Sequence, residues 1–320
     1  MQFRPGSLKC CFAAHVVRKW VLFVFIVHAF FLARRLASDS LTVSNIGSSR
    51  LHHCDKELIE EYKQLPRGSG HPKTSSKWEE KCNLLRKVVK RSSGELEIVM
   101  LGDSIVEFLA GGSGQLQGFP RVPGAHEVWK HEVGNKHNSA LLGSAGDRAA
   151  NLLYRLSHGE FPKGTVPRAI IVHIGINDVL RADKHTLGSP QALDKFAKKL
   201  AGTVMASVAL LHHLSRCSSK IVVLGLMPCG SIAPKAGAPH AYDWPSVYAG
   251  AIAAANRQIK ARVERHPSLQ FLDCGRLLLT QNGTAVSREL TIDGLHPSAG
   301  GYHALLSRCI LPGISRILSP

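Results

Sequence analysis

The stretch Leu101-Gly102-Asp103-Ser104 decides the fold and the chemistry that we expect of this chain. It follows residues 97–100, a run rich in strand formers, and precedes residues 105–109, which are typical of a first helical turn. A serine at such a turn lies at the carboxyl end of a parallel strand, where open α/β sheets bind ligands. A serine hydroxyl alone is a weak nucleophile, so catalysis would need a histidine and an orienting acid. Without these partners, Asp103 and Ser104 would only cap a helix.

Strand-like and helix-like runs alternate through the rest of the chain. Short apolar runs at residues 140–142, 169–174, 220–226 and 269–272 predict strands. Helical periodicity follows them at residues 148–156, 193–214, 248–264 and 300–310. This alternation predicts a three-layer α/β/α sandwich with a mostly parallel, flavodoxin-like sheet.

Two of the predicted strands end in residues that suit an oxyanion hole. Gly146 lies in Gly143-Ser144-Ala145-Gly146-Asp147, after one strand, and its N–H can face the same pocket as Ser104. The alternative is a tight turn with Asp147 as the cap of the next helix. Asn177, in Gly175-Ile176-Asn177-Asp178, follows another strand and can donate its side-chain N–H to an oxyanion. Its alternative is an Asx-turn.

The stretch Asp293-Gly294-Leu295-His296-Pro297 supplies the two partners that Ser104 lacks. A spacing of three residues lets one turn hold the Asp293 carboxylate against Nδ1 of His296 and leaves Nε2 free. The alternative is a surface turn, in which Asp, Gly and Pro are common. The chain has no Gly-x-Gly-x-x-Gly or phosphate-loop motif and no Gly-x-Ser-x-Gly elbow, which excludes common nucleotide-binding enzymes and the usual α/β-hydrolases.

Taken in order, the four motifs around Ser104, Gly146, Asn177 and His296 resemble those of the SGNH, or GDSL, hydrolase family. Within it the chain is most similar to the platelet-activating-factor acetylhydrolase Ib catalytic-subunit-like branch. The segments that carry this likeness are Leu153-Tyr154-Arg155-Leu156, Gly159-Glu160, residues 222–228 and Asn256-Arg257-Gln258. That branch usually has an arginine where this chain has Cys229, and its loops are shorter at residues 111–124 and 230–245.

The resemblance implies an ester hydrolase that works through an acyl-serine, without metal or organic cofactor. Ser104 would be the nucleophile, His296 the general base and Asp293 its orienting acid, with Ser104, Gly146 and Asn177 as oxyanion donors. The expected substrate is a short acyl, such as acetyl, ester of a lipid or a glycan. An acyltransferase on the same site and a non-catalytic binding module are the alternatives, and a homodimer stays open.

The N-terminus carries a membrane signal. Residues 20–33 are apolar except for His28, and basic pairs flank them at residues 18–19 and 34–35. A helix of this length spans about 21 Å, less than the roughly 30 Å hydrocarbon core, but extension back to residue 12 would lengthen it. We expect a signal anchor with a lumenal or extracellular catalytic domain, against the alternatives of a cleaved signal peptide and a buried helix. The predicted organisation is tail and anchor at residues 1–37, stem at 38–74 and hydrolase domain at 75–320.

Composition adds weaker signals. The formal net charge is +17, but the basic residues are scattered and no nucleic-acid-binding motif is present, so we expect no nucleic-acid partner. The eight cysteines lack zinc-site spacing; their even number permits disulfides without defining a pairing. Asn282-Gly283-Thr284 is a glycosylation sequon, which would carry a glycan only in a lumenal domain.

Overall fold

The computed structural model describes residues 55–63, 70–73, 75–91, 96–111, 122–231 and 241–318. They belong to a compact unit that spans Cys54–Pro320. The predicted anchor lies outside the described residues, as do most of the two long loops, at positions 112–121 and 232–240. Within the described part of the chain, every helix is too short or too polar to cross a membrane.

A parallel sheet of five strands forms the centre of the unit. The strands are β1 (Ile98–Gly102), β2 (Ser139–Gly143), β3 (Ala169–His173), β4 (Lys220–Leu224) and β5 (Leu269–Leu272). They lie in the order β2-β1-β3-β4-β5, and each neighbouring pair is parallel. Reversal of the strand order beside β1 is the flavodoxin-like arrangement, in which ligands bind at the carboxyl ends of the strands. The predicted α/β architecture and its five strands are therefore confirmed.

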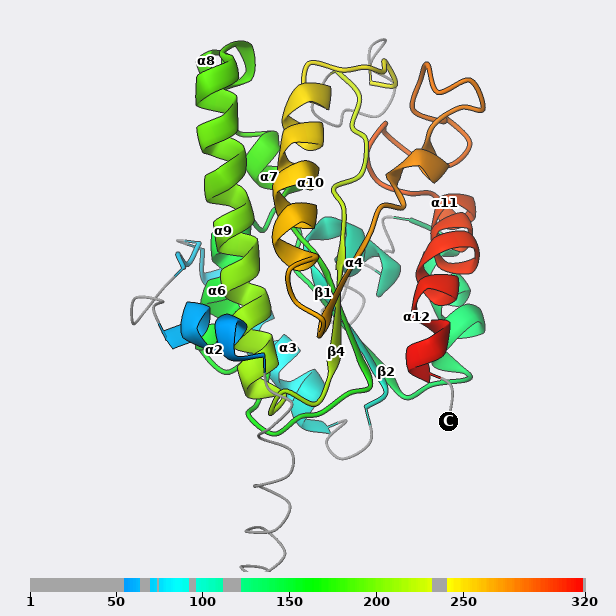
Figure 1. Cartoon of the computed structure of the whole chain (residues 1–320). Coiled ribbons are helices and arrows are strands. Elements are labelled where there is room, and N and C mark those ends of the chain that lie inside the picture. Colours follow the sequence, from blue (N-terminus) through cyan, green and yellow to red (C-terminus); the bar gives the residue numbers. More distant parts are fainter. Residues whose placement is uncertain are drawn as a thin grey trace, which may run out of the picture. The chain divides into compact units, whose positions relative to one another are not determined.

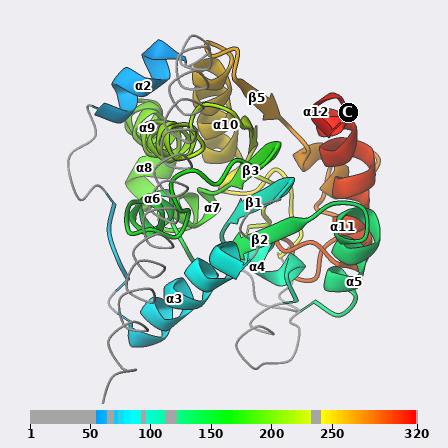
Figure 2. The same ribbon diagram turned by 90° about the horizontal axis from the view of Figure 1, so that it is seen from below.

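Helices cover both faces of the sheet (Figures 1 and 2). On one side lie α6 (Ala149–Ser157), α9 (Pro190–Leu214) and α10 (Ala249–Val263), and α9 packs against each of the other two. On the other side lie α5 (Ala125–Trp129), α11 (Ala299–Leu305) and α12 (Leu311–Leu318). Because both faces are covered, β1 and β3 are buried along their whole length, as the continuous apolar runs of parallel strands require.

Several short helices were not predicted from the sequence. They are α7 (Ile176–Val179), α8 (Lys184–Gly188), the 3₁₀ helix η3 (Gly275–Leu278) and α12. The predicted helix at residues 300–310 consists of α11 and a π-helical turn, η4 (Leu306–Ile310), and a second π-helical turn, η2 (Lys130–Gly134), follows α5. Helix α8 shows why these helices could not be predicted. It is a single turn, and the Asp183 carboxylate caps its start by accepting the Thr186 N–H at 2.6 Å. Elements this short hold too few residues to show a helical period.

The compact unit begins at Cys54, within the stem that the sequence predicts at residues 38–74. Helix α2 (Lys56–Lys63) packs on α9, and Leu58 is completely buried in the main core. Just before α2, the Asp55 carboxylate pairs with Nδ1 of His266 at 2.9 Å. The described residues of the expected stem thus lie against the folded unit.

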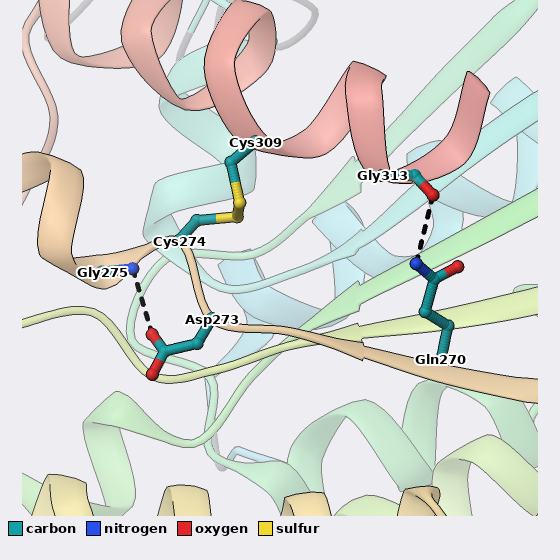
Figure 3. The surroundings of a disulfide bond; sticks show 6 residues. All are labelled: Gln270, Asp273, Cys274, Gly275, Cys309 and Gly313. Carbon is teal, nitrogen blue, oxygen red and sulfur yellow. Dashed lines mark hydrogen bonds between the residues drawn. A yellow bond between two sulfur atoms is a disulfide. The ribbon is translucent and has the colours of Figure 1, made fainter.

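A disulfide joins Cys274, directly after β5, to Cys309 in η4 (Figure 3). Beside it, Nε2 of Gln270 in β5 donates to the Gly313 carbonyl in α12 at 3.1 Å. The disulfide and this hydrogen bond both link the edge-strand region to the C-terminal helices. Cys217 is also disulfide-bonded, whereas Cys82 and Cys229 are free and buried. The sequence permitted disulfides, and the fold determined which residues pair.

Candidate functional site

Ser104 is the first residue of helix α4 (Ser104–Leu109), two positions after the end of β1. The turn needs Gly102, because a Cβ there would lie 2.2 Å from the His173 carbonyl oxygen. The Asp103 carboxylate caps the helix by accepting the N–H of Ile105 at 3.0 Å. Asp103 therefore caps the helix, as the alternative interpretation expected, and Ser104 stands at the end of a strand, where the nucleophile interpretation requires it.

Ser104, His296 and Asp293 form a hydrogen-bonded chain. The Oγ of Ser104 lies 2.9 Å from Nε2 of His296, and Nδ1 of His296 lies 2.6 Å from Oδ2 of Asp293. A neutral His296 with its proton on Nδ1 donates to Asp293 and leaves Nε2 to accept the serine proton. The ring of Phe108 packs on that of His296, with centroids 4.7 Å apart.

The loop that carries Asp293 is shaped to hold a charged carboxylate. Burial by itself raises the pKa of Asp293, but its hydrogen bond and charge interaction with His296 and the N–H groups of His296 and Leu295 outweigh burial, so the pKa lies below its ordinary value. Those N–H groups reach Oδ1 at 2.8 and 3.1 Å. Gly294, at φ +79°, leaves no room for a side chain, because a Cβ would lie 1.7 Å from the Ala241 carbonyl oxygen.

The three predicted oxyanion donors lie at one edge of the sheet. Strand β1 lies between β2 and β3, and the last residues of the three strands pair in register. Ser104, Gly146 and Asn177 follow these strand ends by two, three and four residues. The N–H groups of Ser104 and Gly146 donate to no residue in the described parts of the chain. One N–H of Asn177 Nδ2 donates to the Asp147 carbonyl at 3.0 Å, and its second N–H has no hydrogen-bond partner among the residues that the structure describes.

The Asp147 side chain, directly after Gly146, binds three side chains from other parts of the chain. Its carboxylate is fully buried and accepts Nε1–H of Trp78 at 2.8 Å. It also pairs with Nζ of Lys73 at 2.7 Å and with Nε of Arg155 at 2.8 Å. Trp78 and Lys73 precede the strand that leads to Ser104, and no local pattern in the sequence pointed to them. The alternative role of Asp147, as a side-chain cap of α6, is not the one observed.

The Arg155 side chain donates hydrogen bonds to the carboxyl ends of strands β1 and β2. Its guanidinium is completely buried and donates to the carbonyls of Gly102 at 2.9 Å and of Leu142 at 3.4 Å. It also forms an ion pair with Glu160, which is likewise buried. The five donors of a guanidinium suit such a junction, because they point in several fixed directions. The sequence singled out Arg155 only through its resemblance to a known motif.

Burial shifts the pKa values of two ionisable groups near Ser104 in the direction that favours their neutral forms. Burial raises the pKa of Asp103 to about 7, although the N–H of Ile105 and the charge of His296 act in the opposite direction. Burial also lowers the pKa of His173, at the end of β3, to about 4, so this histidine is uncharged at neutral pH. Neither residue was predicted to be ionically unusual, because burial depends on the tertiary fold.

Two other residues singled out by the sequence are not members of the hydrogen-bonded chain of Ser104, His296 and Asp293. Asn282 is exposed, and its Oδ1 accepts the Thr284 hydroxyl at 2.8 Å, so the sequon is accessible. Cys229 is buried, and burial, with the nearby Asp293 charge, raises the pKa of its thiol to about 12. No cluster of three or more His, Cys, Asp or Glu side chains that could hold a metal ion occurs among the residues that the structure describes.

Comparison with known proteins agrees with this geometry. The model of the GDSL-like Lipase/Acylhydrolase family matches residues 100–304. None of the curated protein sequences compared with the chain matches it.

Similar folds occur among solved structures. A Streptococcus pneumonia protein whose description refers to platelet activating factor is 22% identical, with a TM-score of 0.51 over 75% of this chain and 92% of its own. A GDSL-like lipase from Bacteroides thetaiotaomicron is 17% identical, with a TM-score of 0.49 over 74% and 100% of the two chains. A mutant acetyl-xylooligosaccharide esterase from Geobacillus Stearmophilus is 19% identical, with a TM-score of 0.44 over 71% and 96%. At these identities the likeness concerns the fold.

Proposed function

Because the chain belongs to the GDSL-like lipase/acylhydrolase family, we propose that it is a serine ester hydrolase that uses Ser104, His296 and Asp293. The observation that carries this proposal is the continuous hydrogen-bonded chain from the Ser104 hydroxyl through His296 to Asp293. A surface turn would not direct its histidine at a buried serine that stands at a helix N-terminus.

The proposed reaction has two halves. Ser104 Oγ attacks the ester carbonyl carbon while Nε2 of His296 takes the hydroxyl proton, and the tetrahedral oxyanion accepts hydrogen bonds from Ser104, Gly146 and Asn177. Collapse of this intermediate breaks the bond to the alcohol, which leaves with the proton from His296. Water then attacks the acyl-serine with His296 again as base, releasing the acid and restoring Ser104. Asp293 keeps its negative charge and stabilises the protonated imidazole.

We propose a glycan ester rather than a lipid ester as the substrate. A groove of about 850 Å³ has Arg148 and Asp178 in its lining, the residues directly after Asp147 and Asn177. Its lining includes the polar side chains of Arg181, Asp183, Thr186, Lys199 and Thr203 beside the apolar side chains of Leu153, Phe196 and Leu200. Polar groups that converge on a groove favour an alcohol portion rich in hydroxyls over an acyl tail.

We further propose a short acyl group, such as acetyl, as in the platelet-activating-factor acetylhydrolase Ib branch. The support is the set of shared segments, including Arg155 and Glu160, which form the buried ion pair under the site. Cys229 stands where that branch usually has an arginine, and the two long loops lie mostly outside the described residues. The alcohol preference is therefore proposed from this chain's own groove.

The test is a panel of esters of graded acyl length on sugar and on lipid alcohols, with wild type and Ser104→Ala. We expect wild type to prefer short acyl groups on sugars, and Ser104→Ala to lose activity by at least about 10³-fold while unfolding at the same temperature. A fluorophosphonate probe should label wild type alone. Undiminished hydrolysis by Ser104→Ala would refute the proposal, and absence of both hydrolysis and labelling would favour a binding module. Product in which the acyl group has moved to an added glycan would instead show a transferase.

We also propose that the catalytic domain is lumenal or extracellular, joined to the membrane by the N-terminal segment. The disulfide Cys274–Cys309 supports an oxidising compartment, and the exposed Asn282 sequon is compatible with it. Glycosidase treatment of the protein from a eukaryotic host should increase its mobility. Asn282→Gln and Thr284→Ala should each abolish that shift, whereas Asn135→Gln should preserve it. Unglycosylated wild type with reduced cysteines would contradict this topology.

A further inference from the structure

Lys73 reaches the oxyanion edge from a segment outside the family-matched residues. Its ammonium lies 2.7 Å from the Ala145 carbonyl oxygen and 2.7 Å from Oδ1 of Asp147. It also lies alongside Gly146, since a Cβ on that glycine would be 3.5 Å from Nζ. One side chain therefore contacts the residues on both sides of the glycine whose N–H faces the proposed oxyanion.

Residues Ser144 to Asp147 form a β-turn, and a β-turn of this kind can adopt either of two backbone forms. The Asp147 N–H donates to the Ser144 carbonyl at 3.1 Å, and Gly146, third in the turn, has φ +72° while Ala145 is not left-handed. This is type II geometry. Types I and II differ by a reversal of the central peptide, here the one that joins Ala145 to Gly146. A glycine in the third position makes both forms accessible.

Lys73 holds the central peptide in one of the two orientations. The C=O and N–H of a trans peptide point in opposite directions, so fixing the Ala145 carbonyl on the ammonium also fixes the direction of the Gly146 N–H. A cation on a carbonyl polarises its peptide unit and strengthens the N–H as a donor. On the other side of Ala145, its own N–H donates to Oε2 of Glu107 at 2.5 Å, and Lys81 pairs with the same oxygen at 2.7 Å.

The segment before Lys73 is itself fixed to helix α6, which begins two residues after the turn. The His71 N–H donates to the Ala150 carbonyl at 3.1 Å, and Nδ2 of Asn151 donates to the His71 carbonyl at 2.7 Å. Gly70 packs so closely on Tyr154 that a Cβ would lie 2.5 Å from its backbone nitrogen. Lys73, with 23% of its side chain exposed, therefore extends from a fixed backbone and does not hang free in solvent.

We propose that Lys73 is a positioning residue for the oxyanion hole: its ammonium holds and polarises the Ala145–Gly146 peptide so that the Gly146 N–H points at the reacting carbonyl. This inference rests on the proposed function, in which Gly146 is an oxyanion donor. It extends the working site to the segment Gly70–Lys73, ahead of the family-matched residues.

The test compares Lys73→Met and Lys73→Arg in the full-length protein with a neutral substrate, 4-nitrophenyl acetate. Loss of one oxyanion donor costs about 10²–10³ in rate, so misorientation of Gly146 in Lys73→Met should lower kcat by about 10–100-fold. KM should stay within about threefold, because the oxyanion exists only in the transition state. Lys73→Arg keeps the charge and the donors and should restore most of kcat. Lys198→Met, which removes an exposed lysine paired with Asp194, is the matched control and should match wild type.

A second readout separates positioning from general structural damage. An alkylboronic acid forms a tetrahedral anion on the serine, so its affinity should fall in Lys73→Met by about the same factor as kcat. The urea midpoint should change little. If Lys73→Met does not fold, the uncharged Lys73→Gln replaces it, and kcat equal to that of Lys73→Arg would contradict the proposal.

The outcomes distinguish this inference from the function on which it rests. Wild-type kcat and boronate affinity in Lys73→Met, with no activity in Ser104→Ala, would overturn the role of Lys73 and leave the hydrolase proposal intact. Equal losses in KM and kcat without a change in boronate affinity would also overturn it. Full activity in Ser104→Ala would overturn both.

Discussion

The Oγ of Ser104 lies 2.9 Å from Nε2 of His296, although 192 positions separate the two residues in the chain. Ser104 stands at the end of the central strand β1, whereas His296 stands in the loop that leads into α11. The fold brings them together because α11 contacts α5, which in turn packs on α4, the helix that begins at Ser104. The Tyr302 hydroxyl, donating to the Ile105 carbonyl at 2.6 Å, closes this contact.

Asp293→Asn should lower kcat by about 10³–10⁴-fold with little loss of stability. An asparagine amide presents an N–H to His296 and favours the tautomer whose Nε2 carries the proton, which cannot then accept the Ser104 proton. Steady-state kinetics measure the effect. Asp273→Asn is the matched control, because Asp273 is an exposed carboxylate that accepts the nearby Gly275 N–H and lies outside the hydrogen-bonded chain. An active Asp293→Asn variant would exclude Asp293 as the orienting acid.

Asn177→Ala should lower kcat by about 10²–10³-fold and leave KM within a few-fold, because the lost N–H acts on the oxyanion and not on the ground-state ester. Asn177→Asp should be more damaging, since a carboxylate repels the developing negative charge. Asn135→Ala, at an exposed position, should match wild type. If Asn177→Asp were as active as wild type, the side chain of residue 177 would not face the oxyanion.

Arg155→Met should destabilise the protein by about 3–5 kcal/mol, because it leaves the buried carboxylate of Glu160 without its ion-pair partner and leaves Asp147 with Lys73 alone. Arg155→Lys should be intermediate, since an ammonium cannot reproduce the fork of the guanidinium. Chemical denaturation measures both. Arg276→Met, at an exposed position, should change stability by less than about 0.5 kcal/mol and serves as the control. Equal stability of Arg155→Met and wild type would show that the buried pairs contribute nothing.

Asp103→Asn should change how stability depends on pH. Burial raises the pKa of Asp103 to about 7 in the folded state, against about 3.9 in an unfolded chain. The neutral form is favoured by folding, so its contribution is complete below pH ~4 and is lost as the pH rises to ~7. Across that window the free energy of unfolding of wild type should fall relative to Asp103→Asn, by up to about 1.4 kcal/mol per pH unit. Parallel curves for the two proteins in urea titrations would contradict the raised pKa.

Cys274→Ser combined with Cys309→Ser should lower the free energy of unfolding by about 2–4 kcal/mol, because the disulfide closes a loop with a sequence separation of 35. Neither cysteine belongs to the hydrogen-bonded chain, so kcat should stay within about twofold at temperatures where the variant is folded. Cys82→Ser, which alters a free buried thiol, should cost less than loss of the disulfide. Unchanged stability of the double variant would mean that the cross-link does not constrain the unfolded chain.

The sequence by itself determined the elements whose signal is local. Each strand of the sheet is a short apolar run, and the long helices α6, α9 and α10 repeat their apolar residues at helical spacing. Because the carboxyl ends of parallel strands meet at one edge, the polar residues after β1, β2 and β3 predicted a common site without any coordinates. The close spacing of Asp293 and His296 likewise specified their contact, since one turn joins them.

Tertiary structure alone decided the features that depend on distant residues or on burial. The contacts of Lys73 and Trp78 with Asp147 bridge 74 and 69 positions, as counted from Lys73 and from Trp78, and leave no periodic trace in the sequence. The Cys274–Cys309 pairing and the raised pKa of Asp103 arise in the same way. Local periodicity records which side of an element faces the core, but it carries no information on which distant group that side will meet. That is the physical reason why the four motifs could be predicted from the sequence, whereas the distant side chains that contact them could not.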